Sequence, residues 1–439
     1  MHNLKNKPLV LDLFCGAGGM SEGLLQAGFH IVYSNDISED AMETYINRHE
    51  QLGYIHKNNT FHSCKDINEL SAEEIIKDIN SIKNIDKSNI KIDAIFGGPP
   101  CQGFSRAGRR NSEDPRNKLF KEYLRIIKDL KPTYVVMENV EGFLDTKFEN
   151  FTGITGKKYK AGKAPEILIM EFKKIGYKVL KPKLLNASDY GVPQIRKRAI
   201  FIAYIPNSTI PNYPVSSDKK KITLKEAIYD LSNKEIKPSG YAKQLINGRT
   251  KDINRKKIEY DKIIKRNTEI SIHNEIITER FSLYNYGEST ADLRKRINKN
   301  GIDLSNCKNI LKYLKMETSK SPEEIANHFK KKNISAKDID LLLTRKNIRR
   351  KLDPKLPSPT MVTLPDDFIN PFENRILSVR EMARIQSFDD SFVFLGKRTT
   401  GGHRRKLDVP QYTQVGNAVP PLLAKAIAVE IIKAIKNEQ

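Results

Sequence analysis

Short apolar runs alternate with amphipathic stretches from residue 8 to residue 205, and this alternation is typical of βαβ units that build a mostly parallel sheet. The pattern therefore predicts an α/β fold for this part of the chain. The expected strands cover residues 8–14, 30–35, 92–96 and 133–138, with a further pair at 177–185 and 198–204 around the turn Asp189-Tyr190-Gly191-Val192-Pro193.

Helices are expected between these strands and again after residue 370, where capping signals and one-sided apolar spacing recur. The signals are, in chain order, Ser71 with Glu74, the run Leu119–Leu130, Ser378 with Glu381, and Pro420-Pro421 before Leu422–Ile435. We expect the last of these helices to return to the first domain.

Positive charge is concentrated in the middle of the chain. The sequence of 439 residues has a formal net charge of +23, and residues 211–370 hold 34 lysines and arginines against 21 acidic residues, a net of +13. Clustered basic side chains neutralise phosphates and release their counterions, so a nucleic acid is the expected partner. A lysine-rich genome is the competing explanation. The apolar pattern and the charge distribution together predict a first domain at 1–205, a basic domain at 206–370 and a returning segment at 371–439.

Two helix-start signatures occur within the basic region. They are Ser321-Pro322-Glu323-Glu324 and Ser335-Ala336-Lys337-Asp338, each followed by apolar residues spaced for packed helices. A helix-turn-helix is therefore predicted, and the basic segment 345–351 after it could contact phosphates. A small helical hairpin with a solvated basic end explains the same pattern.

Cys101 is the candidate nucleophile. It follows an expected strand in Gly97-Gly98-Pro99-Pro100-Cys101-Gln102, so its thiol is presented on a turn at a strand end. The remaining cysteines, Cys15, Cys64 and Cys307, lack the close spacing of metal sites or disulfide frameworks. This usage indicates reduced thiols, no metal and a cytoplasmic protein, and no apolar run is long enough to span a bilayer. A buried, inert thiol is the alternative for any one cysteine.

A nucleotide-like ligand is expected at the end of the first strand. The segment Leu11-Asp12-Leu13-Phe14-Cys15-Gly16-Ala17-Gly18-Gly19-Met20 is a glycine turn that passes into a helix, which exposes backbone N–H groups. Asp36 closes the second strand, where an acid can bind ribose hydroxyls, and Asp66 stands at the matching place of the third unit. The turn lacks the spacing of a dinucleotide fingerprint, which favours S-adenosylmethionine over NAD. A tight turn without a ligand is the simpler alternative.

Three further side chains could act with Cys101. Glu138 ends the fourth strand and so brings a carboxyl group to the same edge of the sheet. Arg196 and Arg198 share one face if their segment is extended, because alternate residues of a strand point to the same side. Two guanidinium groups could hydrogen-bond a base oxygen and lower the pKa of the thiol. Exposed, solvated side chains are the alternative at each position.

Together these segments resemble the C5-cytosine DNA methyltransferase family of bacterial restriction–modification systems. Six motifs occur in the family's order, within residues 8–205 and 371–436, and the stretch between them falls where the family carries a variable target-recognition domain. The motifs are Asp12 to Gly19, Pro99-Pro100-Cys101-Gln102, Glu138-Asn139-Val140, Gln194-Ile195-Arg196-Lys197-Arg198, Arg375 to Phe388, and Gln414-Val415-Gly416-Asn417-Ala418-Val419-Pro420-Pro421.

The resemblance implies a Rossmann-like S-adenosylmethionine-dependent methyltransferase sheet with a second, smaller target-recognition domain. It implies a DNA (cytosine-5-)-methyltransferase that flips a cytosine out of the duplex, adds Cys101 to C6 and methylates C5. Glu138 would act at N3, and Arg198 with Arg196 would bind O2. The implied partners are double-stranded DNA, bound by a monomer at the nucleoid in the cytoplasm and not at a membrane, and a cognate restriction endonuclease for the same site.

The resemblance also implies which residues bind the cofactor. Phe14 would stack on the adenine, Asp36 would hold the ribose, and Asp66 would accept from the adenine amino group. The full implied set is Phe14, Ala17, Gly19, Asp36, Ile37, Asp66, Ile67, Pro100, Leu119 and Asn417. Within Pro357-Ser358-Pro359-Thr360-Met361, Thr360 is implied to contact DNA.

One position departs from the family and two other activities stay open. Ala107 stands where a polar residue can enter the gap left by a flipped base, so the side chain that fills this gap is not identified. One branch of the same family uses these catalytic residues on transfer RNA, but the large basic middle region favours DNA. An NAD-type oxidoreductase is the alternative from another class of enzyme.

Overall fold

The computed structural model describes residues 4, 6–87, 90–100, 119–217, 220–232, 235–258, 266–343, 346–402, 404 and 407–438. Of the positions singled out in the sequence, Cys101, Gln102, Ala107 and Arg345 lie outside the described residues. Within the described part of the chain, no helix has both the length and the apolar character needed to cross a bilayer.

The centre of the molecule is an eight-stranded sheet with the order β3-β2-β1-β4-β5-β10-β8 and with β9 beside β10. The first five strands in this order run parallel, and β10 runs antiparallel to β5. Their bounds are β1 Leu9–Leu13, β2 His30–Asn35, β3 Phe61–Ser63, β4 Ala94–Gly97, β5 Tyr134–Val140, β8 Lys178–Val179, β9 Lys183–Asn186 and β10 Lys197–Tyr204. Because β1 lies between β2 and β4, the strand order reverses there, and ligands of such sheets bind at the carboxyl edge beside this point.

The predicted α/β sheet is confirmed, with one strand broken. The run expected at 177–185 is divided into β8 and β9. Pro182 lies between them, and proline has no N–H group to donate to the ladder.

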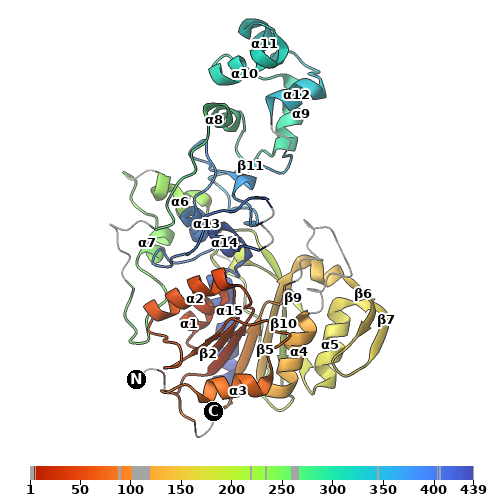
Figure 1. Cartoon of the computed structure of the whole chain (residues 1–439), viewed down its shortest axis with the longest axis vertical. Helices are drawn as coiled ribbons and strands as arrows, with labels where there is room; N and C mark the ends of the chain where they lie inside the picture. The colour runs from red at the N-terminus through yellow and green to blue at the C-terminus, as the bar shows by residue number, and fades with distance from the viewer. Residues whose placement is uncertain are drawn as a thin grey trace.

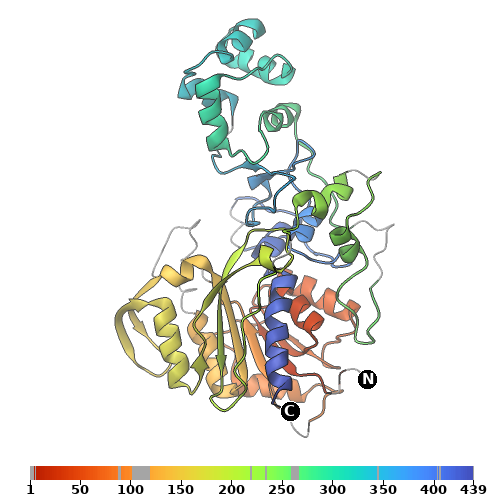
Figure 2. The same cartoon turned by 180° about the vertical axis from the view of Figure 1, so that it is seen from behind.

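Helices cover both faces of the sheet (Figure 1). On one face the buried side chains of α3 (Ala72–Asn80), α4 (Leu119–Leu130) and α5 (Ala164–Lys174) join those of alternate strand residues such as Val135 and Met137. On the other face α1 (Gly19–Ala27) and α15 (Pro421–Lys436) cover the intervening residues, and Figure 2 shows α15 along this face. The helix expected from Leu422 to Ile435 therefore does return to the sheet, as predicted.

The edges of the sheet carry two further elements. At the β3 side, α2 (Glu39–Gln51) follows β2, and its N-terminal Ser38 hydroxyl accepts from the Ala41 N–H group. Beyond β5, the hairpin of β6 (Lys147–Thr152) and β7 (Lys158–Lys163) places Phe148 and Phe151 against Phe120 of α4. The sequence pattern does not predict this hairpin.

A second hydrophobic core lies between the sheet and the far end of the molecule. It joins α6 (Leu224–Ser232) and α7 (Gly240–Ile246) to α13 (Val379–Ile385) and α14 (Gln411–Asn417), so segments from both sides of the basic region pack together. We call this the intermediate core. α13 begins with the capping box of Ser378 and Glu381, as predicted.

A third core is formed mainly by helices and lies farthest from the sheet (Figure 1). We call residues 275–343 the helical unit; its helices are α8 Glu275–Ser282, α9 Thr290–Asn300, α10 Lys308–Thr318, α11 Pro322–Phe329 and α12 Ala336–Leu342. The two predicted helix starts are confirmed, because Ser321 and Ser335 cap α11 and α12. Below the unit, β11 (Arg350–Lys351) pairs with β12 (Phe368–Ile369) and leads back to the intermediate core.

Candidate functional site

The glycine turn lies at the carboxyl end of β1, beside the point where the strand order reverses. Phe14, Gly16 and Gly18 all have positive φ angles, of 60°, 53° and 100°. The turn therefore uses the left-handed region that glycine adopts without strain. A Cβ atom on Gly16 would meet nothing within 4 Å, so there is open space beside the turn.

Asp36 fixes the turn from the end of the neighbouring strand. Its Oδ2 accepts from the Gly16 N–H group at 2.8 Å, and its Oδ1 accepts from Ser38 N–H at 2.9 Å. Burial raises the pKa of Asp36, while the hydrogen bonds from Ser38 and Gly16 act in the opposite direction. A half-buried acid thus stands next to the open space at Gly16.

The residues predicted to surround an adenine follow β2 and β3. These strands are parallel neighbours, so Ile37 and the pair Asp66 and Ile67 come to the same edge of the sheet. Ile37 is 65% exposed, whereas Ile67 is buried and packs into the core on one face of the sheet. Asp66 is partly exposed, and its Oδ1 accepts from the Asn68 backbone and amide groups. An exposed isoleucine at a polar edge is a surface that an apolar ring can cover.

Segments far apart in the sequence complete this edge. A Cβ atom on Gly19 would overlap Val419 O and lie 3.0 Å from Ala418 Cβ, so the glycine turn contacts the end of α14. Asn417 is exposed there, one residue before Ala418. Ala17 is buried in the intermediate core, while Leu119 opens α4 and Pro100 follows β4, both partly buried. The predicted cofactor residues are therefore distributed around one edge of the sheet.

Asp12 is a buried carboxyl group beneath the turn, for which the sequence analysis assigned no role. It accepts from Ser21 Oγ, which also contacts the Tyr45 hydroxyl at 2.9 Å. Burial raises the pKa of Asp12 to about 7, and the negative charge of Asp36 acts in the same direction. An acidic residue inside an otherwise apolar strand was the available signal.

The predicted catalytic carboxyl group and one predicted arginine are in contact. Arg198 Nε lies 2.7 Å from Glu138 Oε1, and the two side chains are 11% and 12% exposed. The pairing follows from the register of β10 and β5, which places Arg198 opposite Val140 and Ile200 opposite Glu138. An ion pair with this much shielding from solvent holds the carboxyl group in one orientation.

The segment that leads to Cys101 passes directly over Glu138. A Cβ atom on Gly98 would lie 3.4 Å from Glu138 Oε2, so the backbone there is close to the carboxyl group. The Asn139 amide donates to Pro99 O at 3.2 Å, which ties this segment to β5. Cys101 is two residues further on and lies outside the described residues. The described backbone therefore brings the chain to Glu138 just before the predicted nucleophile.

Arg196 points to backbone carbonyl groups of two other segments. Its Nη1 donates to Met361 O and its Nη2 to Gly416 O, each at 3.0 Å. The side chain is buried, and burial together with the charge of Arg198 lowers its pKa. Nearby, Thr360 Oγ1 donates to Ile195 O at 2.8 Å. The residue predicted to contact DNA therefore lies against the segment just before β10, next to Arg196. The role of each residue stays a prediction.

Two glutamines of this region were missed by the sequence analysis. Gln194 and Gln386 are fully buried, and the Gln194 amide donates to Gln386 Oε1 at 2.7 Å. Both lie within motifs quoted above, but a polar side chain gives no sign in the sequence of being buried.

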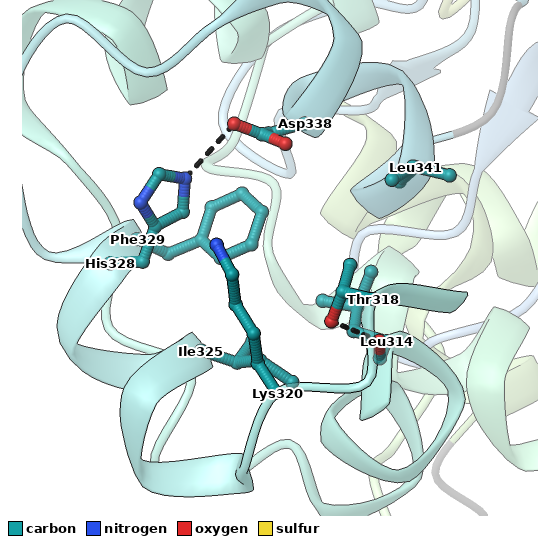
Figure 3. A pocket seen from close by; sticks show the side chains of 8 residues that line it. All are labelled: Leu314, Thr318, Lys320, Ile325, His328, Phe329, Asp338 and Leu341. Atoms are coloured by element: carbon teal, nitrogen blue, oxygen red, sulfur yellow. Dashed lines mark hydrogen bonds and ion pairs between the residues drawn. The ribbon is translucent and has the colours of Figure 1, made fainter. Parts of the chain in front are cut away.

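Within the described residues, no group of three or more histidine, cysteine or acidic side chains is placed to hold a metal ion. A cavity of about 20 Å³ lies in the helical unit between Leu314, Ile325 and Phe329 (Figure 3). Its rim includes His328, which contacts Asp338 at 3.0 Å. That volume accommodates about one water molecule and no cofactor.

Comparison with known proteins gives a consistent result over nearly the whole chain. The model of the C-5 cytosine-specific DNA methylase family matches residues 9–433. The chain is 33% identical to the type II methyltransferase M.DdeI of Desulfomicrobium norvegicum, covering 98% of this chain and 89% of that protein. It is 31% identical to the type II methyltransferase M1.HphI of Haemophilus parahaemolyticus, covering 98% and 87%.

Solved structures show the same fold. A DNA modification methyltransferase encoded within an E. coli prophage aligns with a TM-score of 0.64 and 23% identity, over 98% of this chain and 100% of the other. The methyltransferase EhMeth of Entamoeba histolytica aligns with a TM-score of 0.52 and 14% identity, over 98% and 99% of the two chains. At these identities the likeness concerns the fold alone.

Proposed function

The chain belongs to the C-5 cytosine-specific DNA methylase family and is a DNA cytosine-5 methyltransferase of the type II restriction–modification kind, and on that premise we propose how it acts. The methyl group of S-adenosylmethionine is transferred to C5 of a cytosine while Cys101 is bonded to C6 of the same base. The Glu138–Arg198 ion pair beneath the segment that leads to Cys101 is the observation that carries this proposal.

The edge around the glycine turn fits S-adenosylmethionine. Open space at Gly16, the carboxylate of Asp36 and the exposed Ile37 match a ligand that has hydroxyl groups and an apolar ring. Asp66 and Ile67 would bind the adenine from the third strand, with Phe14 on its other side. Gly19, Ala17 and Asn417 would face the methionine portion, and Pro100 and Leu119 would close the walls. When bound, the cofactor supplies an electrophilic methyl group.

Cytosine C5 is a poor nucleophile, which explains why a thiolate and a carboxyl group are needed. Addition of the Cys101 thiolate to C6 forms an S–C bond and moves an electron pair into the ring. Glu138 protonates N3 and Arg198 binds O2, so the added charge is neutralised. C5 then takes the methyl group, with S-adenosylhomocysteine as the leaving group. A base removes the C5 proton as the S–C bond breaks to release the thiolate, and the N3 proton returns to Glu138. Because both terminal nitrogens of Arg196 are bound to carbonyl groups, we assign this residue to positioning of Arg198.

The base must leave the DNA stack to reach these groups. We propose that residues 206–370 recognise the target sequence, that Thr360 contacts the DNA, and that residues 371–439 complete the catalytic domain. The net charge of +23 supports binding to the phosphate backbone. We also propose that the protein acts as a monomer on nucleoid DNA in the cytoplasm, and that a restriction endonuclease cuts at the same site.

A fluorinated substrate tests the covalent mechanism. In a duplex that has 5-fluorocytosine at the target position, methylation leaves fluorine on C5, and fluorine cannot depart as a cation. We expect a protein–DNA adduct that survives denaturing electrophoresis, forms only with S-adenosylmethionine present, and maps to Cys101. An unmodified duplex provides the control, because elimination regenerates the free thiol, and Cys101→Ala should give no adduct. If the protein methylates an unmodified duplex efficiently but the fluorinated duplex never traps it, the covalent mechanism is wrong.

A further inference from the structure

Five residues from four distant segments form a buried hydrogen-bonded cluster between the sheet and the intermediate core. We call Gln194, Arg196, Met361, Gln386 and Gly416 the amide junction. Gln194 and Arg196 lie just before β10, and Met361 directly follows Thr360. Gln386 is the C-terminal cap of α13, and Gly416 lies in α14. The side chains of Gln194, Arg196 and Gln386 are 2% exposed or less.

Backbone groups determine the orientation of both amide side chains. Gln194 Oε1 accepts from the Met361 N–H group at 2.8 Å, so its NH₂ group is directed to Gln386 Oε1 at 2.7 Å. Gln386 in turn donates to Val415 O at 2.7 Å and Ala418 O at 3.3 Å. Reversing either amide would place two donors or two acceptors face to face, and an unpaired buried polar group costs about 1–3 kcal/mol.

Two backbone segments of the junction are also joined by pairing. We call residues 358–362 the recognition segment and residues 193–196, directly before β10, the strand entry. Ile195 N–H donates to Ser358 O at 2.7 Å, and Ser358 N–H donates to Pro193 O at 2.9 Å. With Arg196 bound to Met361 O, residues 358–361 are held along residues 193–196 at several consecutive points. A shift of Thr360 therefore moves the strand entry, which leads to Arg198.

The same cluster reaches the cofactor side through α14. A Cβ atom on Gly416 would lie 2.6 Å from Val362 O, so helix and recognition segment meet backbone to backbone. Arg196 Nη2 bonds Gly416 O, and Gln386 bonds the carbonyl groups on both sides of it in sequence, at Val415 and Ala418. Asn417 lies within this short stretch, and Ala418 contacts Gly19 of the glycine turn.

We propose that Gln194 and Gln386 are positioning residues that couple DNA binding at the recognition segment to cofactor binding at Asn417. The inference rests on the proposed function, which places DNA at Thr360 and the cofactor at the glycine turn. A close-packed cluster without flexible contacts transmits a displacement on one side to the other. Coupling of this kind is reciprocal: DNA raises the affinity for the cofactor by the factor by which the cofactor raises the affinity for DNA.

The test measures a thermodynamic cycle on the full chain. Bisulfite sequencing of DNA from expressing cells first identifies the target, and calorimetry then gives the dissociation constant of S-adenosylhomocysteine with and without a target duplex. We expect the duplex to lower this constant in the parent protein by at least about fivefold, in the usual range of site–site coupling. In Gln386→Glu, which keeps the bond from Gln194 but loses both donors to α14, the ratio should fall to within about twofold of one.

Gln414→Glu is the matched control. Gln414 is an equally buried glutamine on α14, but its amide donates to Asp40 O, Leu395 O and Val409 O, outside the amide junction. It should keep the parent coupling ratio, even if its thermal stability falls. Gln194→Met, which removes the link from the other end without adding charge, should lose coupling as Gln386→Glu does, and it replaces that variant if the glutamate prevents folding.

The outcomes separate the two proposals. A parent protein that binds no S-adenosylhomocysteine contradicts the proposed function itself. Three results would each overturn the role of the amide junction. The parent could bind S-adenosylhomocysteine equally well with and without DNA, or Gln386→Glu and Gln194→Met could keep the parent ratio of dissociation constants. The third is a Gln414→Glu control that loses coupling to the same extent. The positioning role also predicts that Gln386→Glu raises the KM for DNA while single-turnover methylation with saturating DNA and cofactor slows by less than about tenfold.

Discussion

Removal of His49 should reduce the acid sensitivity of the fold. His49 lies on α2, with its ring stacked on Tyr45 at 3.9 Å between centroids and its Nδ1 2.9 Å from Tyr45 O. The ring of His62 lies 5.4 Å away, edge to face. Burial lowers the pKa of His49 to about 3, that of His62 to about 2 and that of His30 to about 4. All three rings are therefore neutral in the folded protein.

The size of the effect follows from proton linkage. An unfolded histidine takes up a proton near pH 6.5, whereas folded His49 does so only near pH 3, so stability is lost as the pH falls between these values. Each proton changes the free energy of unfolding by about 1.4 kcal/mol per pH unit. Between pH 7 and pH 5 the His49 contribution is about 2 kcal/mol, a large fraction of a typical total of about 5–15 kcal/mol.

Comparison of two proteins isolates this contribution. Asp12, with its pKa raised to about 7, gains protons in the folded state over the same range and offsets part of the loss, but it does so in parent and variant alike. Urea unfolding of the parent and of His49→Gln at pH 7, 6 and 5 should give profiles that diverge, with the variant losing about 2 kcal/mol less by pH 5. Met42→Ala removes a buried, non-titrating side chain of the same helix and should only shift the parent profile downward. Parallel profiles for His49→Gln and the parent would refute the reasoning.

Three further predictions concern catalysis, packing and recognition. Glu138→Gln should lower the single-turnover methylation rate by about two orders of magnitude or more, since the proton donor is lost, and a near-normal rate would assign that role elsewhere. Gly23→Ala should lower the free energy of unfolding by about 1–3 kcal/mol, because its Cβ would lie 2.6 Å from Pro421 O, whereas Gly240→Ala meets no atom within 4 Å; equal urea midpoints for the two would contradict this. Exchange of residues 211–370 for those of a relative with another target should change the methylated sequence in bisulfite sequencing, and persistence of the old target would show the recognition region to be misplaced.

The sheet and its main helices were predictable because their signals are local. β1, β2, β4 and β5 are largely buried, so each contains a short run of three or four apolar residues, and α4 has the bounds Leu119–Leu130 given by its one-sided apolar spacing. The acids after β2 and β3 were predictable for the same reason, since the ends of parallel strands meet at one edge. The β6–β7 hairpin was missed because half of its exposed positions are lysines, and Phe148, Phe151 and Tyr159 are too few to form a strand pattern.

The contacts of Arg196 show what local signals leave out. Alternation along an extended segment places Arg196 and Arg198 on one side, but it does not distinguish their partners. Arg198 meets Glu138 of the neighbouring strand, whereas Arg196 binds carbonyl groups 165 and 220 residues away. These distant segments are brought together by the intermediate core, whose packing has no counterpart in any short stretch of sequence.

The contact between α1 and α15 has a consequence for synthesis on the ribosome. α15 covers the sheet face next to α1, and Gly23 approaches Pro421 and Lys425 so closely that no side chain fits between the helices. About 400 residues separate the two helices, which at roughly 5–20 residues per second corresponds to about 20–80 s of translation. During that interval the apolar face of the nascent sheet lacks its cover, while the helical unit, whose core is formed mainly within residues 275–343, can fold as it emerges. A truncated chain would therefore be a substrate for chaperones and proteases before it could modify any DNA.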